Sequence, residues 1–173
     1  AECAGTISAL GQGVTGLTVG QPVMAMAGGS FRTFVTTPAE YVAPIPAGLN
    51  PQQAATVPVA FLTAEYALNH LARMKRGDRV LIHAAAGGVG VPAVQLAMRA
   101  GAEVFATVGS AEKRAYLESI GVRHIMNSRT LDFADEIMAL TEGRGVDIVL
   151  NSLAGDFIPA SLRALGANGR FVE

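Results

Sequence analysis

Cysteine, tryptophan and histidine are scarce in this sequence. Its 173 residues include one cysteine, Cys3, no tryptophan, and three histidines at positions 70, 83 and 124. A single cysteine excludes an internal disulfide framework and is typical of a reducing compartment, so we expect a cytoplasmic protein. Histidines spread so widely show none of the spacings of a metal site, and we therefore expect no zinc.

Charge is also scarce, because Asp, Glu, Lys and Arg make up only 16% of the chain and the formal net charge is −1. No basic cluster indicates binding to nucleic acid or to an anionic membrane surface. The apolar stretch that begins at Val57 is interrupted by Glu65 and Arg73, so we expect no segment that spans a bilayer. The chain starts on Ala1 without methionine and stops within a strand-like run at 169–173, and we interpret it as an excised fragment.

Glycine and β-branched residues dominate residues 1–48. Short strand-like runs are separated by glycine turns, at 5–9, 23–26, 31–36 and 41–45. These strands are too few for a closed barrel. We predict a partial all-β segment over 1–48 and a domain boundary marked by Pro44, Pro46 and Pro51.

Residues 49–173 have an α/β pattern. Asn50 and Pro51 are a good N-cap and first residue for a short helix to about 57. A longer helix is expected from Pro58 to about Met74, with an apolar side at Val59, Leu62, Tyr66, Leu71 and Met74. Strands then alternate with helices, the strands at 79–83, 103–108, 124–126, 146–151 and 169–173 and the helices at 88–100, 111–120, 132–141 and 156–165. This alternation predicts a Rossmann-type, doubly wound parallel sheet that lacks its last elements.

A glycine-rich turn joins the first of these strands to the next helix. Residues 85–90 read A-x-G-x-x-G, with Ala85 in place of the first glycine of the dinucleotide-binding motif. A strand, a glycine turn and a helix N-terminus in this order form a pyrophosphate site. The cofactor-binding residues expected here are Ala86, Gly87, Gly88, Val89 and Gly90.

The end of the second strand indicates which dinucleotide binds. Gly109 and Ser110 stand where NAD-specific sheets usually place an acidic residue, and Lys113 and Arg114 follow. We expect Ser110, Lys113 and Arg114 to hold the 2′-phosphate of NADPH, the alternative being that both cations are solvated.

The third and fourth strands end in further candidates. Ser128 and Arg129 would lie beside the adenosine ribose, although a surface arginine is an equal interpretation. The turn of Asn151, Ser152 and Leu153 would face the nicotinamide, or would only cap the next helix.

Two further polar residues have competing interpretations. Thr63 would reach the nicotinamide, or would bond back to the helix carbonyl at 59. His83 is expected to be a satisfied core histidine. We find no acid–base pair and no nucleophilic triad, and hydride transfer needs none.

Four motifs carry a family resemblance. They are TVPVAFLTAEYAL at 56–68, HAAAGGVG at 83–90, VGSAEKRAYL at 108–117 and VDIVLNSLAG at 146–155, with GRFVE at 169–173. The chain resembles the enoyl reductase domain of modular polyketide synthases and animal-type fatty acid synthases. That domain belongs to the zinc-free branch of the medium-chain dehydrogenase/reductase superfamily.

The resemblance implies an NADPH-dependent reduction of an α,β-unsaturated thioester on an acyl carrier protein. Residues 1–48 would then be part of a GroES-like substrate domain, and 49–173 an NADPH-binding domain that is incomplete at its C-terminus. The family's proton donors would fall beyond Glu173. Phe34 matches a substrate-pocket position where some members carry a tyrosine, which implies the stereochemical outcome of the non-tyrosine type. Partners implied are the other domains of the synthase and a second copy in a homodimer.

Two other functions remain open from the sequence. A stand-alone NADPH quinone oxidoreductase would share the glycine turn and the cationic pocket. A fragment that only binds nucleotide or dimerises, without turnover, would fit a chain whose proton donors are absent.

Overall fold

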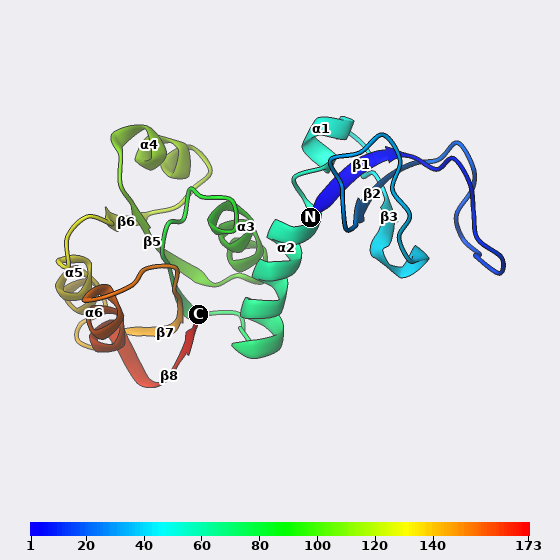
Figure 1. Cartoon of the computed structure of the whole chain (residues 1–173). Helices are drawn as coiled ribbons and strands as arrows, with labels where there is room; N and C mark the ends of the chain where they lie inside the picture. The colour runs from blue at the N-terminus through cyan, green and yellow to red at the C-terminus, as the bar shows by residue number, and fades with distance from the viewer. The chain divides into compact units, whose positions relative to one another are not determined.

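The computed structural model describes residues 1–173, which form two compact units, 1–62 and 63–173. The division falls within helix α2 (Pro58–Glu65), labelled in Figure 1. The domain boundary that the sequence suggests after residue 48 stays a prediction. None of the helices has the length and the apolar character that crossing a membrane requires.

The first unit contains a three-stranded antiparallel sheet in the order β1-β2-β3. Its elements are β1 (Glu2–Thr6), β2 (Pro22–Met26), the 3-10 helix η1 (Ala39–Tyr41), β3 (Val42–Pro44) and helix α1 (Pro51–Ala54). The strands expected at 23–26 and 41–45 are confirmed, and the one expected at 5–9 lies earlier in the chain.

The strand expected at 31–36 is wrong. These residues form bends and a loop, in which the side chains of Phe31 and Phe34 are exposed. Strand β2 already pairs with β1 on one edge and with β3 on the other, so its hydrogen-bonding edges are filled. The loop is anchored instead by the hydroxyl of Thr37, which donates to the carbonyl of Met26 at 2.8 Å.

Helix α1 begins where its cap predicts. The Asn50 side chain accepts a hydrogen bond from the backbone N–H of Gln53 at 2.8 Å, and the Gln53 side chain accepts one from the backbone of Asn50 at 3.0 Å. This reciprocal capping box satisfies two amides that the helix cannot satisfy itself.

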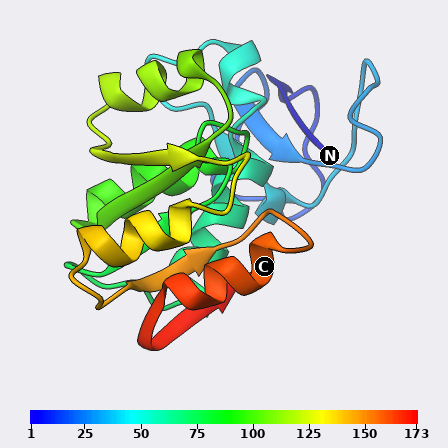
Figure 2. The ribbon, with the colours of Figure 1, turned by 90° about the vertical axis from the view of Figure 1, so that its left-hand side faces the viewer.

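The second unit is built on a five-stranded parallel sheet in the order β6-β5-β4-β7-β8 (Figure 2). The strands are β4 (Arg79–Ile82), β5 (Glu103–Val108), β6 (His124–Asn127), β7 (Val146–Leu150) and β8 (Leu165–Val172). The order reverses between β4 and β7, as in a doubly wound sheet, and the predicted fold class is confirmed. Strand β8 starts earlier than expected, and its register against β7 is interrupted between Val146 and Ile148.

Helices cover both faces of this sheet. They are α3 (Gly90–Ala100), α4 (Ala111–Ser119), α5 (Phe133–Leu140) and α6 (Phe157–Ala164). Residues of α3 and α4 pack with one face of the strands, in a core that includes Val80, Val94 and Leu117. Residues of α5 and α6 pack with the other face, around Leu81 and Phe133.

The helix that follows Pro58 differs from the prediction. It continues from α2 as the π-helical segment η2 (Tyr66–Leu71). The expected apolar side is wrong, since Tyr66 and Leu71 are exposed at 56% and 49% while Leu68 is fully buried. The buried residues are mostly small, namely Ala64, Ala67 and Ala72 with Leu68, and small side chains bring this helix close to the sheet.

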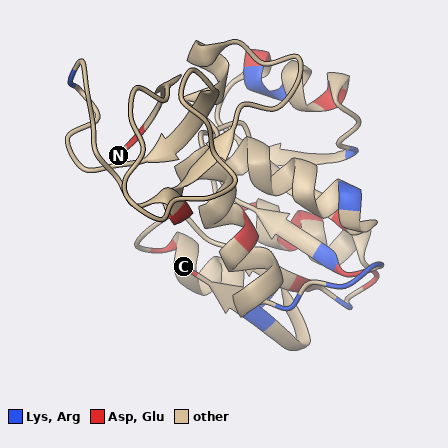
Figure 3. Ribbon diagram, turned by 90° about the vertical axis from the view of Figure 1, so that its right-hand side faces the viewer, with Lys and Arg blue, Asp and Glu red and all other residues tan.

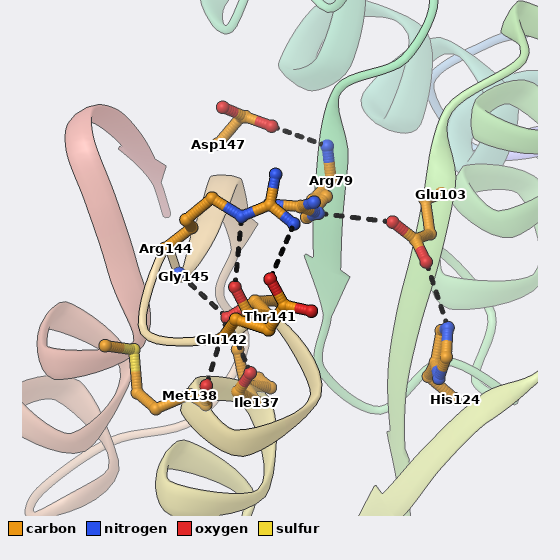
Figure 4. A network of polar contacts seen from close by, with 10 residues as sticks. All are labelled: Arg79, Glu103, His124, Ile137, Met138, Thr141, Glu142, Arg144, Gly145 and Asp147. Carbon is orange, nitrogen blue, oxygen red and sulfur yellow. Dashed lines mark hydrogen bonds and ion pairs between the residues drawn. The ribbon is translucent and has the colours of Figure 1, made fainter.

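Charge is distributed unevenly between the units, as Figure 3 shows. Residues 1–62 contain one arginine and two glutamates, and all other charged residues belong to the second unit. Several lie where the strands begin (Figure 4). There Glu103 accepts from Arg79 at 3.2 Å and contacts His124 at 3.0 Å, while Asp147 accepts the backbone N–H of Arg79 at 2.7 Å. At the opposite edge of the sheet, where the strands end, no ion pair joins two strands.

Candidate dinucleotide-binding site

The turn between β4 and α3 presents free backbone donors. The amide N–H groups of Gly88, Val89 and Gly90 have no hydrogen-bond partner within the chain. Gly88 and Val89 are exposed, and α3 extends for 11 residues behind them. Consecutive free N–H groups at the positive end of a helix dipole attract a phosphate group.

Each glycine of this turn lacks a side chain for a different structural reason. A Cβ at Gly90 would overlap the Ala84 carbonyl oxygen and lie 2.7 Å from the Cα of Ala85, so Gly90 allows the start of α3 to approach the backbone of the turn closely. A Cβ at Gly87 would lie 2.9 Å from the same oxygen. A Cβ at Gly88 would meet nothing within 4 Å, which leaves a bare backbone surface for a ligand.

Ala85 occupies the place of the motif's first glycine without strain. The left-handed conformation is at Ala84, with a φ of 47°, and Ala85 has none. Ala85 is fully buried, and its N–H donates to the carbonyl of Thr107 at 3.1 Å. A methyl group is therefore accepted at the position where the sequence departs from the motif.

Two of the cations expected at the 2′-phosphate lie on the first turn of α4. Ser110 caps this helix, and its hydroxyl accepts the N–H of Lys113 at 3.3 Å. The ammonium group of Lys113 has no partner within the chain, while Arg114 makes a long contact of 3.9 Å with Glu118. An exposed pair at this distance holds its partners weakly, so both side chains are available to an anion.

Arg129 follows the end of β6, and its side chain lies against Gly109 at the end of β5. The Asn127 side chain accepts the N–H of Arg129 at 2.9 Å, and the N–H of Ser128 donates to Val108 at 2.9 Å. The guanidinium then lies across Gly109, where a Cβ would be only 2.7 Å from its Nε atom. The structure thus brings Ser110, Gly109 and Arg129 together, and Gly109 makes room for the arginine.

The turn after β7 holds its own backbone. The buried side chain of Asn151 donates to the carbonyl of Leu153 at 2.7 Å and accepts from its N–H at 3.2 Å. Ser152 is exposed and Leu153 is half-buried. The amide of Asn151 is thus used within the turn, and a contact of these residues with nicotinamide stays a prediction.

The two remaining candidates lie on other elements. Thr63 is exposed on α2, and its role at the nicotinamide stays a prediction. Phe34 belongs to the first unit, where it is 75% exposed and lines a hollow of about 450 Å³ together with Cys3, Val23 and Ala25.

His83 is a satisfied core histidine, as expected. It is 2% exposed, its Nδ1 lies 2.9 Å from the Thr107 hydroxyl, and its Nε2 lies 2.8 Å from the Ser161 hydroxyl. Burial lowers the pKa of His83 from 6.5 to about 4. The sequence reasoning missed Thr107 and Ser161, although each is a hydroxyl in an otherwise apolar strand or helix.

Comparison with known proteins agrees with this geometry. A family model described as zinc-binding dehydrogenase matches residues 88–173. The chain is 48% identical over 172 residues to a phenolphthiocerol/phthiocerol polyketide synthase polypeptide of Mycobacterium tuberculosis, covering 99% of this chain and 8% of that protein. The crystal structure of CurK enoyl reductase shares 55% identity with a TM-score of 0.94, covering 98% of this chain and 51% of that one. Along nearly its whole length the chain is similar to enoyl reductase domains of polyketide synthases.

The predicted enoyl reductase resemblance is therefore confirmed. The chain spans about half the length of the CurK enoyl reductase structure and a small part of the mycobacterial synthase. A third similar protein is the mycobacterial Rv1454c, whose structure is complexed with NADPH, at 35% identity and a TM-score of 0.89, covering 98% of this chain and 54% of that one. Although the matching family model is described as zinc-binding, no group of three or more His, Cys, Asp or Glu residues here is arranged to hold a metal ion.

Proposed function

We propose that the chain is the cofactor-binding part of an enoyl reductase that uses NADPH to reduce an α,β-unsaturated acyl thioester on an acyl carrier protein. The observation that carries the proposal is the run of three free N–H groups at Gly88, Val89 and Gly90. Similarity to the enoyl reductase of CurK along 98% of the chain supports the reaction class.

The residues at the carboxyl edge of the sheet fit a phosphorylated dinucleotide. Gly88 offers a surface without side chain for the pyrophosphate, and the amides beside it are donors without acceptors. At the end of β5 no carboxylate occupies the position that would repel a 2′-phosphate, and Lys113, Arg114 and Arg129 offer cations there. Arginine and lysine are the usual partners of phosphate groups.

The chemistry that the cofactor supplies when bound is a hydride from its nicotinamide. The chain's part in the reaction is to bind and orient: the glycine turn fixes the pyrophosphate, and the three cations fix the ribose phosphate. The hydride would form a new C–H bond at the β-carbon of the thioester. The π electrons of the carbon–carbon double bond would shift to place the negative charge on the thioester oxygen, and the α-carbon would then take up a proton. We assign no donor of that proton within residues 1–173.

The partners follow from the same proposal. The substrate is an enoyl thioester on an acyl carrier protein, and the neighbours are the other domains of a synthase. The pairing of two copies and the role of Phe34 in stereochemistry belong to the proposal as well.

A fluorescence titration of the chain with NADPH and NADH tests the cofactor assignment. We expect tighter binding of NADPH, and the double variant Lys113→Ala/Arg114→Ala should reduce the difference, with Arg129 still in place, while leaving NADH affinity unchanged. Lys75→Ala is the matched control, because Lys75 precedes β4 at the opposite edge of the sheet. Equal affinities for both dinucleotides in the unmodified chain would contradict the assignment. In a separate activity assay, reduction of quinones but not of crotonyl thioesters would favour the quinone oxidoreductase.

A further inference from the structure

His83 joins three parts of the carboxyl edge of the sheet. It follows the last residue of β4, and its backbone N–H donates to Leu150, the last residue of β7, at 3.1 Å. Its ring lies 2.9 Å from the Thr107 hydroxyl on β5 and 2.8 Å from the Ser161 hydroxyl on α6. One buried side chain therefore connects two neighbouring strands and a helix.

Thr107, His83, Ser161 and the carbonyl of Phe157 form a chain of hydrogen bonds, and the direction of each bond follows from Ser161. The Ser161 hydroxyl donates its one proton to the carbonyl of Phe157 at 2.7 Å, so it accepts from His83. The neutral ring therefore carries its proton on Nε2, and Nδ1 accepts the proton of the Thr107 hydroxyl. Every polar atom in this series has a partner, which fixes both the tautomer and the rotation of the ring.

No charged group forms a hydrogen bond with this ring, and burial is the cause of its lowered pKa. Its contacts include the hydroxyls of Thr107 and Ser161 and the ring of Phe133, which meets that of His83 edge-on at 5.0 Å. The surroundings keep the imidazole neutral, with its single donor and single acceptor, over the ordinary range of pH.

Each partner of His83 leads directly to a turn of the candidate site. The carbonyl of Thr107 accepts the N–H of Ala85 inside the glycine turn at 3.1 Å, and Thr107 precedes Gly109 by two residues. Phe157 is the first residue of α6, the helix that follows the Asn151 turn.

We propose that His83 is a positioning residue for the dinucleotide site, which sets the glycine turn of residues 84–90 relative to the ends of β5 and α6. This inference rests on the proposed NADPH binding. An apolar ring of similar size would fill the same space but would supply neither directional bond, so it would leave the turn free to shift. A shift of a fraction of an ångström is enough to weaken bonds to a bound phosphate.

Variants of His83 can separate the effect of its hydrogen bond to Thr107 from that of its hydrogen bond to Ser161. In His83→Asn the side-chain oxygen can accept from Thr107, and in His83→Gln the amide can donate to Ser161, while His83→Phe does neither. Thr141→Val is the matched control, since the Thr141 hydroxyl is buried and bonded to Ile137 at 2.7 Å and to Gly145 at 2.9 Å, at the opposite edge of the sheet (Figure 4).

The readouts are the Kd for NADPH and hydrogen exchange of the amides of residues 84–90 without nucleotide. We expect His83→Phe to raise Kd about tenfold, the effect of one lost hydrogen bond to the ligand, and to speed exchange in the turn. His83→Asn should restore most of the affinity, and Thr141→Val should change neither readout despite a similar loss of stability.

Unchanged exchange and affinity in His83→Phe would overturn the inference, and so would an equal loss in Thr141→Val. If His83→Phe does not fold, Thr107→Val and Ser161→Ala each remove one of the two hydrogen bonds of the ring. The same Kd and hydrogen-exchange measurements then test the inference. A wild-type chain that binds no NADPH would refute the proposed function alone, because the exchange of the turn still reports on His83.

Discussion

The free energy of unfolding should depend on pH through His83. Its pKa is lowered from 6.5 to about 4 by burial, so between these values the unfolded chain binds a proton that the native chain does not. Stability is therefore unaffected by this group above pH 6.5 and falls as the pH is lowered towards 4. At roughly 1.4 kcal/mol for each pH unit, the total loss is roughly 3 kcal/mol.

Urea unfolding at a series of pH values, followed by circular dichroism, measures this loss. Carboxylates also titrate in this range, so the comparison is between the wild type and His83→Asn, which lacks the titrating group. The variant should be less stable at neutral pH, and the difference between the two proteins should shrink by roughly 2 kcal/mol on going to about pH 5. A difference that stays constant with pH would show that the native histidine titrates normally, and would refute the buried, neutral ring.

Three more predictions concern the site and its scaffold. Gly90→Ala should destabilise the second unit, because its Cβ would overlap the Ala84 carbonyl oxygen. Gly88→Ala should fold normally and weaken NADPH binding in a fluorescence titration. Normal NADPH binding by Gly88→Ala would place the pyrophosphate elsewhere. Gly109→Ala should displace Arg129, whose Nε would lie 2.7 Å from the new Cβ, and should weaken NADPH more than NADH; equal weakening would argue against a 2′-phosphate contact. Asn50→Ala removes the capping box of α1 and should lower the unfolding free energy by about 1 kcal/mol in urea, and no change would mean that the cap is replaced by solvent.

The parallel sheet could be predicted because its pattern is local. Each strand of the second unit is a short apolar run that ends in a turn signal, and the helices between them have caps such as Ser110. The strand expected at 31–36 has the same local pattern, but these residues pair with no strand of the β1-β2-β3 sheet. Pairing partners are a tertiary property that a single segment does not encode.

The candidate site was predictable only in part, for a similar reason. The glycine turn is a contiguous motif, and its position between β4 and α3 agrees with the sequence. The place of Arg129 over Gly109 and the bonds of His83 to Thr107 and Ser161 join residues that are far apart in the chain. The buried side of α2 and η2 is formed mostly by alanines, so the positions of large apolar residues do not indicate it.

The uneven distribution of charge has a consequence for the rate of cofactor binding. The second unit carries twelve basic and twelve acidic residues, so it has no net charge with which to attract a distant anion. Only the local field of Lys113, Arg114 and Arg129 favours a dinucleotide phosphate, and salt screens that field over roughly 8 to 10 Å. The association rate should therefore be that of an unsteered encounter and should change little with ionic strength, while the dissociation rate should rise with salt as the last contacts are screened.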